Sequence, residues 1–435
     1  MKWIGVLAAA AIIAPAAGYA QGQRDGTGIR AGSFIISPGF KVTQGLDSNF
    51  FLEEDDATLT SVSRLAPRVG VESDWRRHAV RLDFGAEYGI ISQDFDDNYL
   101  DYNARFRGVA DFTRDIRLNG ELGFRHGHER RGEDDVPIAD LGAVTTITIE
   151  PVEFDEIKAG LEGDINRGRF RLAPFGEVVR LNFDDAATVI TDPGANLISE
   201  GVANQDDRDR VEVETGVEVG YAVQSGYEAF LRGSYFLAEY DEFDDALVAI
   251  PGGTRSLSRD SDGFRILAGT KIDLTRLIEA SLGVGFEQRS YDDEALEDFS
   301  GVSADIDVVW DVTPLTNVFV NISREIEETS VFGATNFVDT GGFVGVTHDL
   351  RRNLSLQASL SYVFREFDGA AAIVGAPVGG LDREDQLFDA AIGADWQVNR
   401  RLTISPRYRF GLRESTLADT DYIAHIFDVS ADLRF

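Results

Sequence analysis

From Ser33 onward, the dominant period in the sequence is two, with apolar and polar side chains alternating. Over residues 401–413, RLTISPRYRFGLR, every second residue is apolar, aromatic or proline, and every residue between them is polar or glycine. Residues 80–90 and 353–367 follow the same pattern. Successive side chains of a strand point to opposite faces, so each segment predicts a β-strand with one apolar and one polar face.

Continued along the chain, this alternation predicts eighteen strands. They lie near residues 33–45, 61–74, 78–94, 98–113, 116–130, 152–166, 169–183, 209–223, 227–241, 262–273, 277–291, 299–311, 316–328, 338–349, 353–367, 385–397, 401–414 and 421–435. The phase weakens near Pro174 and Phe175, and the strand at 338–349 is short with an inward face that the pattern does not fix. No segment approaches the roughly 18 uninterrupted apolar residues of a membrane-spanning helix.

The connections between these strands alternate in length. Tight turns such as 113–115, 166–168 and 398–400 join every second pair of strands, whereas most of the other connections are long and acidic, as at 131–151 and 184–208. This asymmetry is typical of a transmembrane antiparallel up-and-down β-barrel with short periplasmic turns and long extracellular loops. A propeller would show a fixed repeat of roughly 40 to 50 residues, and a sandwich needs no alternation of turn length.

The N-terminal residues have the features of an export signal. Lys2 precedes an apolar stretch from Ile4 to Ala14, and small residues precede Gln21. We therefore expect a signal peptide at 1–20, a short periplasmic segment at 21–32 and the barrel at 33–435.

The C-terminal residues predict the strand that closes the barrel. Alternate positions at the end of the chain are apolar or aromatic, namely Phe427, Val429, Ala431, Leu433 and Phe435. This pattern resembles the C-terminal signature by which outer-membrane barrels are recognised for insertion, which implies the barrel-assembly machinery as a partner. With an even strand count, the last strand can pair with the first and leave no exposed edge, so we expect a location in the bacterial outer membrane.

Aromatic residues suggest two belts at the membrane interfaces. Trp75, Trp310 and Trp396 lie at or beside short turns, where the rings can contact lipid headgroups. At the opposite ends of the strands we expect a second belt, formed by Phe95, Tyr99, Phe183, Tyr240, Tyr291 and Phe367.

The charge and the polar residues restrict the possible functions. There are 75 acidic and 41 basic residues, a net charge of −34, which argues against a nucleic-acid partner. The chain lacks cysteine and has no serine in a nucleophile-elbow motif. His126 and His128 are predicted to share a strand face, but no second cluster completes a metal site, which favours a solvated strand end. We therefore predict no catalytic residue, no metal site, no cofactor and no enzymatic activity.

The acidic loops allow two interpretations. Clusters such as 94–98 and 291–298 could bind divalent cations that bridge to lipopolysaccharide phosphates, or they could form a solvated, self-repelling rim. The second interpretation is favoured, because runs of like charge usually serve that purpose.

The polar strand faces predict a charged lumen, because eighteen strands enclose an aqueous space too wide for side chains to fill. A basic wall is expected from Arg105, Arg107, Arg407, Arg409 and Arg413. An acidic wall is expected from Glu212, Glu214, Glu218, Asp305 and Asp307. The two walls would produce a transverse field that sorts charged solutes, or their charges would simply pair across neighbouring strands.

Two short motifs resemble the beta-barrel porin 2 family. Asp47-Ser48-Asn49-Phe50 is similar to an Asp-x-Asn-aromatic element near the start of those proteins, and Leu65-Ala66-Pro67 is similar to the Leu-x-Pro strand that follows. The resemblance covers the mature chain and implies an outer-membrane barrel. Members are often associated with exopolysaccharide or capsule production, and the resemblance supplies no catalytic residues.

The first functional hypothesis is therefore an outer-membrane channel that exports an exopolysaccharide or capsule-type polymer. The alternatives are a general or anion-biased diffusion porin and a non-transporting surface scaffold or adhesin. The expected partners are outer-membrane lipid and lipopolysaccharide, the barrel-assembly machinery and periplasmic polysaccharide-export components.

Overall fold

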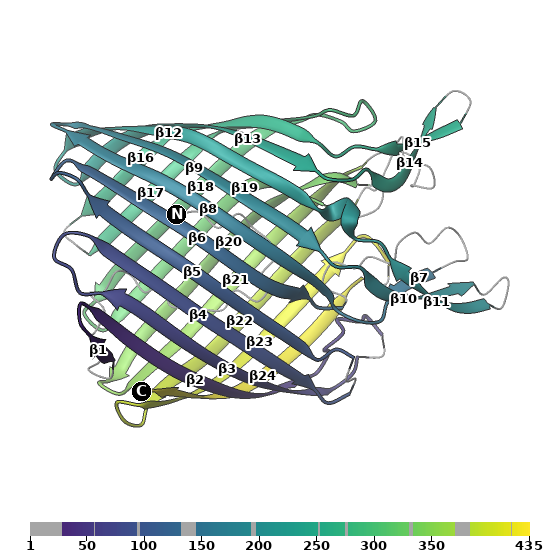
Figure 1. The fold of residues 1–435 in the computed structure, drawn as a ribbon, viewed down its shortest axis with the longest axis horizontal. Helices are drawn as coiled ribbons and strands as arrows, with labels where there is room; N and C mark the ends of the chain where they lie inside the picture. Colours follow the sequence, from purple (N-terminus) through teal and green to yellow (C-terminus); the bar gives the residue numbers. More distant parts are fainter. Residues whose placement is uncertain are drawn as a thin grey trace.

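The computed structural model describes residues 28–55, 57–93, 96–131, 145–192, 197–250, 253–274, 277–329, 334–369, 383–418 and 420–435. Its main sheet is antiparallel, and each barrel strand pairs with the strand that precedes it and the strand that follows it among the barrel strands (Figure 1). Because β2 also pairs with β24, the sheet closes on itself as a barrel. Among the described residues, no helix is long and apolar enough to cross a membrane.

All eighteen predicted strands are confirmed. They are β2 (Phe34–Asp47), β3 (Thr60–Ser73), β4 (Ala79–Ile91), β5 (Tyr99–Asp111), β6 (Ile116–Glu129), β8 (Val152–Arg167), β9 (Phe170–Phe183), β12 (Arg210–Gln224), β13 (Tyr227–Tyr240), β16 (Ser261–Leu274), β17 (Ile278–Tyr291), β18 (Phe299–Thr313), β19 (Thr316–Glu328), β20 (Ala334–Arg351), β21 (Leu354–Gly369), β22 (Arg383–Gln397), β23 (Leu402–Ser415) and β24 (Tyr422–Arg434). The largest difference is at β20, which begins four residues before the predicted 338–349.

Backbone and side-chain hydrogen bonds join the first and last barrel strands, β2 and β24, along the seam where the sheet closes. The register runs from Gly39 opposite Arg434 to Asp47 opposite Ile426. Inside the barrel, the hydroxyl oxygens of Thr43 and Ser430 lie 2.9 Å apart. Arg68 on β3 donates two hydrogen bonds to Asp432 on β24, at 2.6 and 2.8 Å, and so spans β2. These contacts leave no open edge at the seam, as the sequence predicts.

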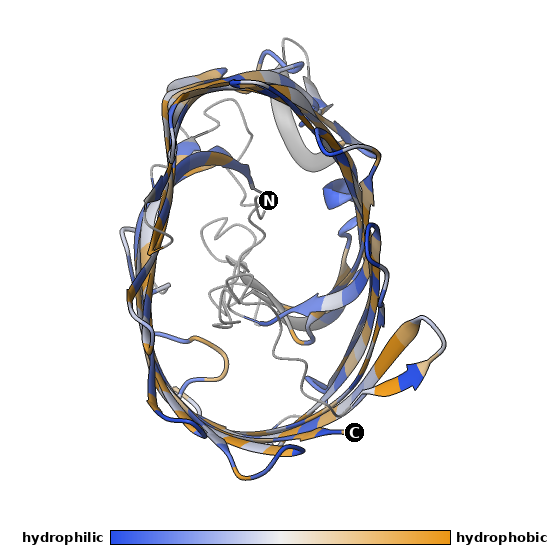
Figure 2. Cartoon of the chain, turned by 90° about the vertical axis from the view of Figure 1, so that its left-hand side faces the viewer, coloured by the Kyte–Doolittle hydropathy of each residue, from blue (hydrophilic) through white to orange (hydrophobic). Residues whose placement is uncertain are grey.

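The two faces of the wall differ in the way that the alternation predicts. Large apolar side chains are exposed at alternate outward positions, such as Leu231 and Tyr235 on β13 and Val284 and Phe286 on β17. Figure 2 looks along the barrel and shows one wall enclosing an elongated opening. The outer face therefore matches a lipid environment and the inner face a watery one.

Several elements outside the barrel were not predicted from the sequence. A short strand, β1 (Ile29–Ala31), pairs with the start of β2, within the expected N-terminal segment 21–32. Strands β7 (Thr145–Thr148), β10 (Ala186–Asp192) and β11 (Leu197–Ala203) form a small sheet, β14 (Asp244–Ile250) pairs with β15 (Gly253–Leu257), and a 3₁₀ turn η1 covers Asp206–Arg208. The labelled β-strands of these long connections extend beyond one end of the barrel (Figure 1).

The prediction of a second aromatic belt is wrong, because these side chains lie on the inner face of the barrel. Tyr99, Phe183, Tyr291 and Phe367 are 5–8 % exposed, and Tyr240 stacks with Arg210 inside the wall, so these rings do not face lipid. Phe95 lies outside the described residues. Tyr99 has the same parity on β5 as Arg105 and Arg107, which places all three on the inner face. Trp75, Trp310 and Trp396 are exposed next to the short turns, as expected for the other belt.

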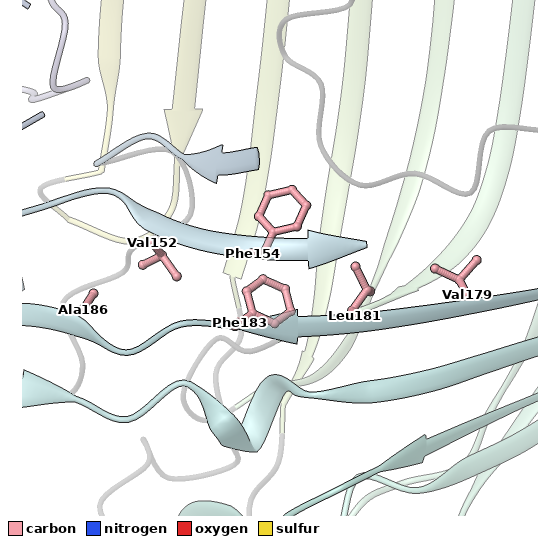
Figure 3. Packing of buried hydrophobic residues seen from close by; sticks show 6 residues of the cluster. All are labelled: Val152, Phe154, Val179, Leu181, Phe183 and Ala186. Carbon is pink, nitrogen blue, oxygen red and sulfur yellow. The ribbon is translucent and has the colours of Figure 1, made fainter. Parts of the chain in front are cut away.

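Some of the inward rings form small apolar clusters at the long-loop end of the barrel. In one of them Phe154 on β8 and Phe183 on β9 have ring centroids 5.6 Å apart. Figure 3 shows the members of this cluster along β8, β9 and the residues after them: Val152, Phe154, Val179, Leu181, Phe183 and Ala186. The inner face is therefore polar along most of its length but apolar in patches near this end.

Inward glycines make room for some of the inward rings. A Cβ at Gly269 on β16 would lie 2.0 Å from the carbonyl oxygen of Leu282 and 2.6 Å from Cζ of Phe230. Both distances are too short for a real contact, so the ring of Phe230 lies in the space that a side chain on β16 would occupy.

We expect Gly269→Ala to destabilise the barrel by about 1–3 kcal/mol, because the added methyl group overpacks the wall. Gly233→Ala is the matched control, since a Cβ at Gly233 meets nothing within 4 Å. Urea unfolding of the barrel in lipid vesicles, followed by the heat-modifiable gel shift, measures both variants. Equal stability of the two would contradict the packing described for Phe230.

Candidate functional site

Part of the wall between β18 and β19 is not paired. Pairing between these strands ends at Ala304 opposite Arg324, although β18 starts at Phe299 and β19 continues to Glu328. The last residues of β19 remain paired with β20, from Glu325 opposite Asp339 to Glu328 opposite Asn336. Residues 334–339 of β20 also stay paired with β21, from Ala334 opposite Gly369 to Asp339 opposite Arg365. The end of β19 and the start of β20 therefore separate from β18 but remain joined to the wall through β21. We call residues 325–328 and 334–339 the ribbon.

The contacts of Glu328 show that the ribbon bends into the barrel. Its carboxylate accepts hydrogen bonds from Ser261 Oγ at 3.1 Å and Tyr240 Oη at 3.4 Å, and it pairs with Arg289. These partners belong to β16, β13 and β17, whereas β18 is the neighbour of β19 in the wall. Adjacent strands are about 4.8 Å apart, so β13 lies roughly 19 Å from β19 along the wall. A glutamate side chain cannot span that distance, so the ribbon lies inside the wall.

Contacts on both sides hold the ribbon in this position. On the β16 side, Arg259 donates to the carbonyl oxygens of Ala334 and Thr335 at 3.2 and 3.4 Å. On the β21 side, Arg365 donates two hydrogen bonds to Asp339, at 2.8 and 2.9 Å. The ring centroids of Phe337 and Phe367 lie 5.4 Å apart. The ribbon thus narrows the lumen near the long-loop end.

The two faces of the ribbon have different environments. Ile326 and Val338 are paired and buried, and they share a face with Glu328, which contacts the wall. Glu325, Glu327 and their partners Asp339 and Phe337 share the opposite face. Residues of this face also contact the wall, because Glu325 lies 3.8 Å from Arg265 on β16 and Asp339 accepts hydrogen bonds from Arg365 on β21.

The ribbon and the wall around it form one group of interacting charges. We call these residues the ribbon cluster, and they comprise seven carboxylates (Glu212, Glu214, Glu287, Glu325, Glu327, Glu328 and Asp339) and five guanidinium groups (Arg210, Arg259, Arg265, Arg289 and Arg365). Within this group, Arg265 lies 2.6 Å from Glu287 and 3.8 Å from Glu325.

The contact between ribbon and wall leaves polar atoms without partners. Among the described residues, Nε of Arg289, Oε1 of Glu287 and Oγ1 of Thr335 are buried and have no hydrogen-bond partner. Each such atom costs free energy, so this contact is less stable than a continuous strand ladder would be.

The predicted lumen walls lie on opposite halves of the ring. The basic residues are on β5 and β23, which lie on either side of the seam between β2 and β24 and within a few strands of it. The acidic residues are on β12 and β18, on the far side of the ring. Whether this arrangement produces a transverse field stays a prediction.

Most of the predicted basic wall is paired locally. Arg105 lies 3.2 Å from Glu121, Arg107 lies 3.3 Å from Asp83, and Arg407 lies 3.9 Å from Asp395. Arg413 donates to the carbonyl oxygen of Thr420 at 2.6 Å and stacks on Tyr422, and Arg409 lies near Asp389 and Asp428. These arginines therefore add little free positive charge to the lumen.

The predicted acidic wall divides into two groups. Glu212 and Glu214 belong to the ribbon cluster, and Glu212 pairs with Arg210 at 2.7 Å. Glu218 pairs with Arg171, Arg232 and Lys271, and Asp305 lies 3.6 Å from Arg232. Asp307 accepts a hydrogen bond from Asn321 at 2.9 Å. The alternation in the sequence predicted that these carboxylates lie on the inner face. It gave no sign of the ribbon, which lies near Glu212 and Glu214.

The predicted insertion signature occupies the outward face of β24. Phe427, Val429 and Phe435 are exposed there, and Leu433 is half-buried. The backbone N–H of Phe435 donates to the carbonyl oxygen of Pro38 at 3.0 Å, which ties the last residue to the first barrel strand. Its recognition by the assembly machinery stays a prediction.

The two neighbouring histidines do not share a ligand. His126 stacks on Tyr102 and lies 2.8 Å from Asp155, whereas His128 stacks on Tyr99 and lies 2.7 Å from Asp101. Within the described part of the chain, no group of three or more histidine, aspartate and glutamate side chains is arranged to hold a metal ion.

One hairpin outside the barrel is fastened by an ion pair whose carboxylate is buried and whose arginine is partly exposed. Arg255 on β15 pairs with Asp293, which follows β17 and also accepts the backbone N–H groups of Ala295 and Ser258 at 2.9 and 3.2 Å. The hydrogen bonds from Arg255 lower the pKa of the Asp293 carboxyl to about 2. Because the folded state lowers this pKa, the ion pair stabilises the hairpin at pH values above about 4, and the stabilisation disappears as the pH falls through about 2.

We therefore expect the β14–β15 hairpin to be released between about pH 4 and pH 2. Asp293→Asn should release it at neutral pH, because the amide cannot pair with the Arg255 charge. Glu297→Gln is the control, since Glu297 is exposed in the same connection. Hydrogen exchange of the hairpin amides measures the release, and equal protection in wild type and Asp293→Asn at pH 7 would contradict the role of this pair.

Comparison with known families completes the description of the barrel. The family model described as "Putative beta-barrel porin 2" matches residues 24–435. The chain belongs to this family. The match covers nearly the entire chain, and the closed barrel of eighteen strands is the expected architecture. Family and barrel together place this porin-family member in the bacterial outer membrane, where it forms a channel of the porin type.

Three solved structures illustrate the similarity of this family member to other barrels. The siderophore receptor PiuA from Acinetobacter baumannii is 10 % identical, with a TM-score of 0.49 over 94 % of this chain and 82 % of that chain. The ferric enterobactin receptor PfeA from Pseudomonas aeruginosa, as a mutant, is 10 % identical, with a TM-score of 0.47 over 92 % and 80 %. Pseudomonas aeruginosa OpdK with vanillate is 10 % identical, with a TM-score of 0.45 over 92 % and 99 %. No curated protein sequence matches the chain.

Proposed function

We propose that this porin-family member is an outer-membrane channel through which an exopolysaccharide or capsule-type polymer leaves the cell. The observation that carries the proposal is the polar inner face of a closed barrel of eighteen strands, which is wide enough to enclose an aqueous passage. Sugar hydroxyls exchange hydrogen bonds with the polar side chains of such a surface. The known association of the family with polymer production supports the same substrate class.

A diffusion porin is the alternative that shares these features. Local pairing of the basic wall gives no support to an anion bias, because Arg105, Arg107 and Arg407 each face a carboxylate. The proposal includes no enzymatic step. Its partners are lipopolysaccharide around the barrel and periplasmic polysaccharide-export components at the short-turn end.

Deletion of the gene tests the proposal. Loss of surface polymer, with polymer retained in the periplasm, would support export. Normal surface polymer together with altered uptake of small solutes would contradict export and favour a diffusion porin. Purified protein in planar bilayers gives the complementary measurement, since either kind of channel conducts ions, whereas a non-transporting surface scaffold does not.

A further inference from the structure

We propose that the hairpin formed by β1 and the start of β2 is a lipid anchor, which lies in the membrane interface at the short-turn, periplasmic end of the barrel. We call residues 28–36 the anchor hairpin. Its partner is the phospholipid surface around the barrel, whatever solute or polymer the channel carries. The position of the hairpin, its exposed side chains, its charge and its contact with the tryptophan belt all favour this partner.

The anchor hairpin lies outside the ring of barrel strands. β24 ends at Arg434, and β1 pairs with the part of β2 beyond this point, from Ile29 opposite Ile36 to Ala31 opposite Phe34. Figure 1 places β1 next to the C-terminus, and Figure 2 shows a mostly apolar hairpin at that place, which projects outward from the ring and away from the lumen. The hairpin is therefore surrounded by either lipid or water.

The side chains of the anchor hairpin are apolar and largely uncovered. All three residues of β1 are exposed, and Ile29 is 57 % exposed. The facing residues 34–36 of β2, which are phenylalanine and two isoleucines, are only half-buried. In water, a short apolar strand with one free edge promotes aggregation, and natural proteins cover such edges or protect them with charge. Lipid contact would cover this one.

The charge of the anchor hairpin differs from that of other connections at the same end. The turns at 113–115, 166–168 and 398–400 each contain an arginine, whereas the turn of the anchor hairpin is Gly32-Ser33. The one charged side chain of the hairpin, Arg30, is paired with Asp74 at 2.7 Å. A hairpin whose only charge is paired can enter the interface, where strongly charged turns remain in water.

The outward face of the anchor hairpin continues the lipid-facing surface of the barrel. Phe34 contacts Trp75 of the short-turn belt, with ring centroids 5.6 Å apart in an edge-to-face arrangement. Ile36 is two residues from Phe34 on the same strand, and Ile29 lies opposite Ile36, so the three side chains share one face. Ile36 also lies opposite Val71 on the outer side of β3. Lipid that contacts Trp75 therefore contacts this face as well.

The test uses single labels, because the chain has no cysteine. Ile29→Cys and Arg352→Cys are each labelled with the environment-sensitive dye NBD in the purified, full-length barrel in phospholipid vesicles. Arg352→Cys is the matched control, since Arg352 is exposed in the short turn between β20 and β21. We expect lipids with a nitroxide near the headgroup to quench the dye at position 29 several-fold more strongly than at position 352. Ala31→Cys, also on β1, is the second variant if Ile29→Cys inserts poorly.

Two results would overturn the inference. Quenching on β1 no stronger than at position 352 would show that the hairpin lies in water. Photocrosslinking from benzophenone at position 29, in isolated outer membranes, identifies what covers the hairpin there, and adducts with phospholipid would support the anchor. A discrete adduct with a second copy of the chain or with another protein, in place of lipid, would contradict it and assign the free edge of β1 to strand pairing between chains.

Discussion

Shortening the ribbon should raise the single-channel conductance several-fold. Replacing residues 327–337 with Asn-Gly joins Ile326 to Val338, which already face each other in the register, through a turn suited to a tight hairpin. The change removes Glu328, which contacts β16, and Phe337, which packs on Phe367 of β21. Single-channel recording in planar bilayers measures the result.

The control for this variant is the same operation on the β14–β15 hairpin, which extends beyond the end of the barrel (Figure 1). Its removal should leave the conductance unchanged. An unchanged conductance in the ribbon variant, with the barrel folded, would show that the ribbon does not limit the passage.

Removing the carboxylate of Glu218 should cost about 3 kcal/mol of folding stability, because three partly buried cations lose the buried partner that they share. The side chain of Glu218 is 3 % exposed and pairs with Arg171, Arg232 and Lys271 at once. Arg171 and Arg232 keep contacts with Glu228 and Asp305, which limits the loss for these two. Lys271 keeps no ion pair among the described residues in Glu218→Ala.

Urea unfolding in lipid vesicles measures this loss. Glu72→Gln breaks a pair that is about half exposed, with 3.7 Å between Glu72 and Arg81, and should cost less than about 1 kcal/mol. Equal costs for the two variants would mean that the three cations around Glu218 do not depend on its charge.

The alternation of side chains was sufficient to predict the barrel. A strand whose outer face meets lipid and whose inner face meets water must alternate, so the signal recurs in every strand, including β9, where Pro174 and Phe175 weaken it. Connection lengths then placed the turns and loops at opposite ends. The seam followed because an open edge is not tolerated in a bilayer.

The second aromatic belt was predicted from the position of each aromatic residue along its strand. The face on which the side chain lies was not considered. Tyr99 and Tyr291 stand at the correct strand ends for an interface belt, but their parity places them inside. Counting from Arg105 back to Tyr99 would have shown this. The inner rings pack on neighbouring strands and bind arginines, as Tyr422 does with Arg413.

The ribbon could not be predicted from the alternation. Glu325 and Glu327 continue the pattern of β19 without interruption, and the loss of pairing with β18 has no local sequence signal. The bend depends on long-range partners, such as Arg289 and Tyr240, whose proximity exists only in the closed barrel. The small sheets in the long connections escaped prediction for a related reason, because short strands carry little periodic signal.

A disulfide across the seam tests most directly whether the sheet closes. The chain has no cysteine, and the hydroxyl oxygens of Thr43 and Ser430 are 2.9 Å apart, so Thr43→Cys with Ser430→Cys places two thiols within bonding reach. Thr43→Cys with Ser234→Cys is the control, since Ser234 lies on β13, far around the ring. In intact outer membranes under mild oxidation, the account predicts that the first pair cross-links and that fragments cut between residues 43 and 430 stay joined until reduced. Two free, reactive thiols in the first pair, or equal cross-linking in the control, would contradict a closed barrel.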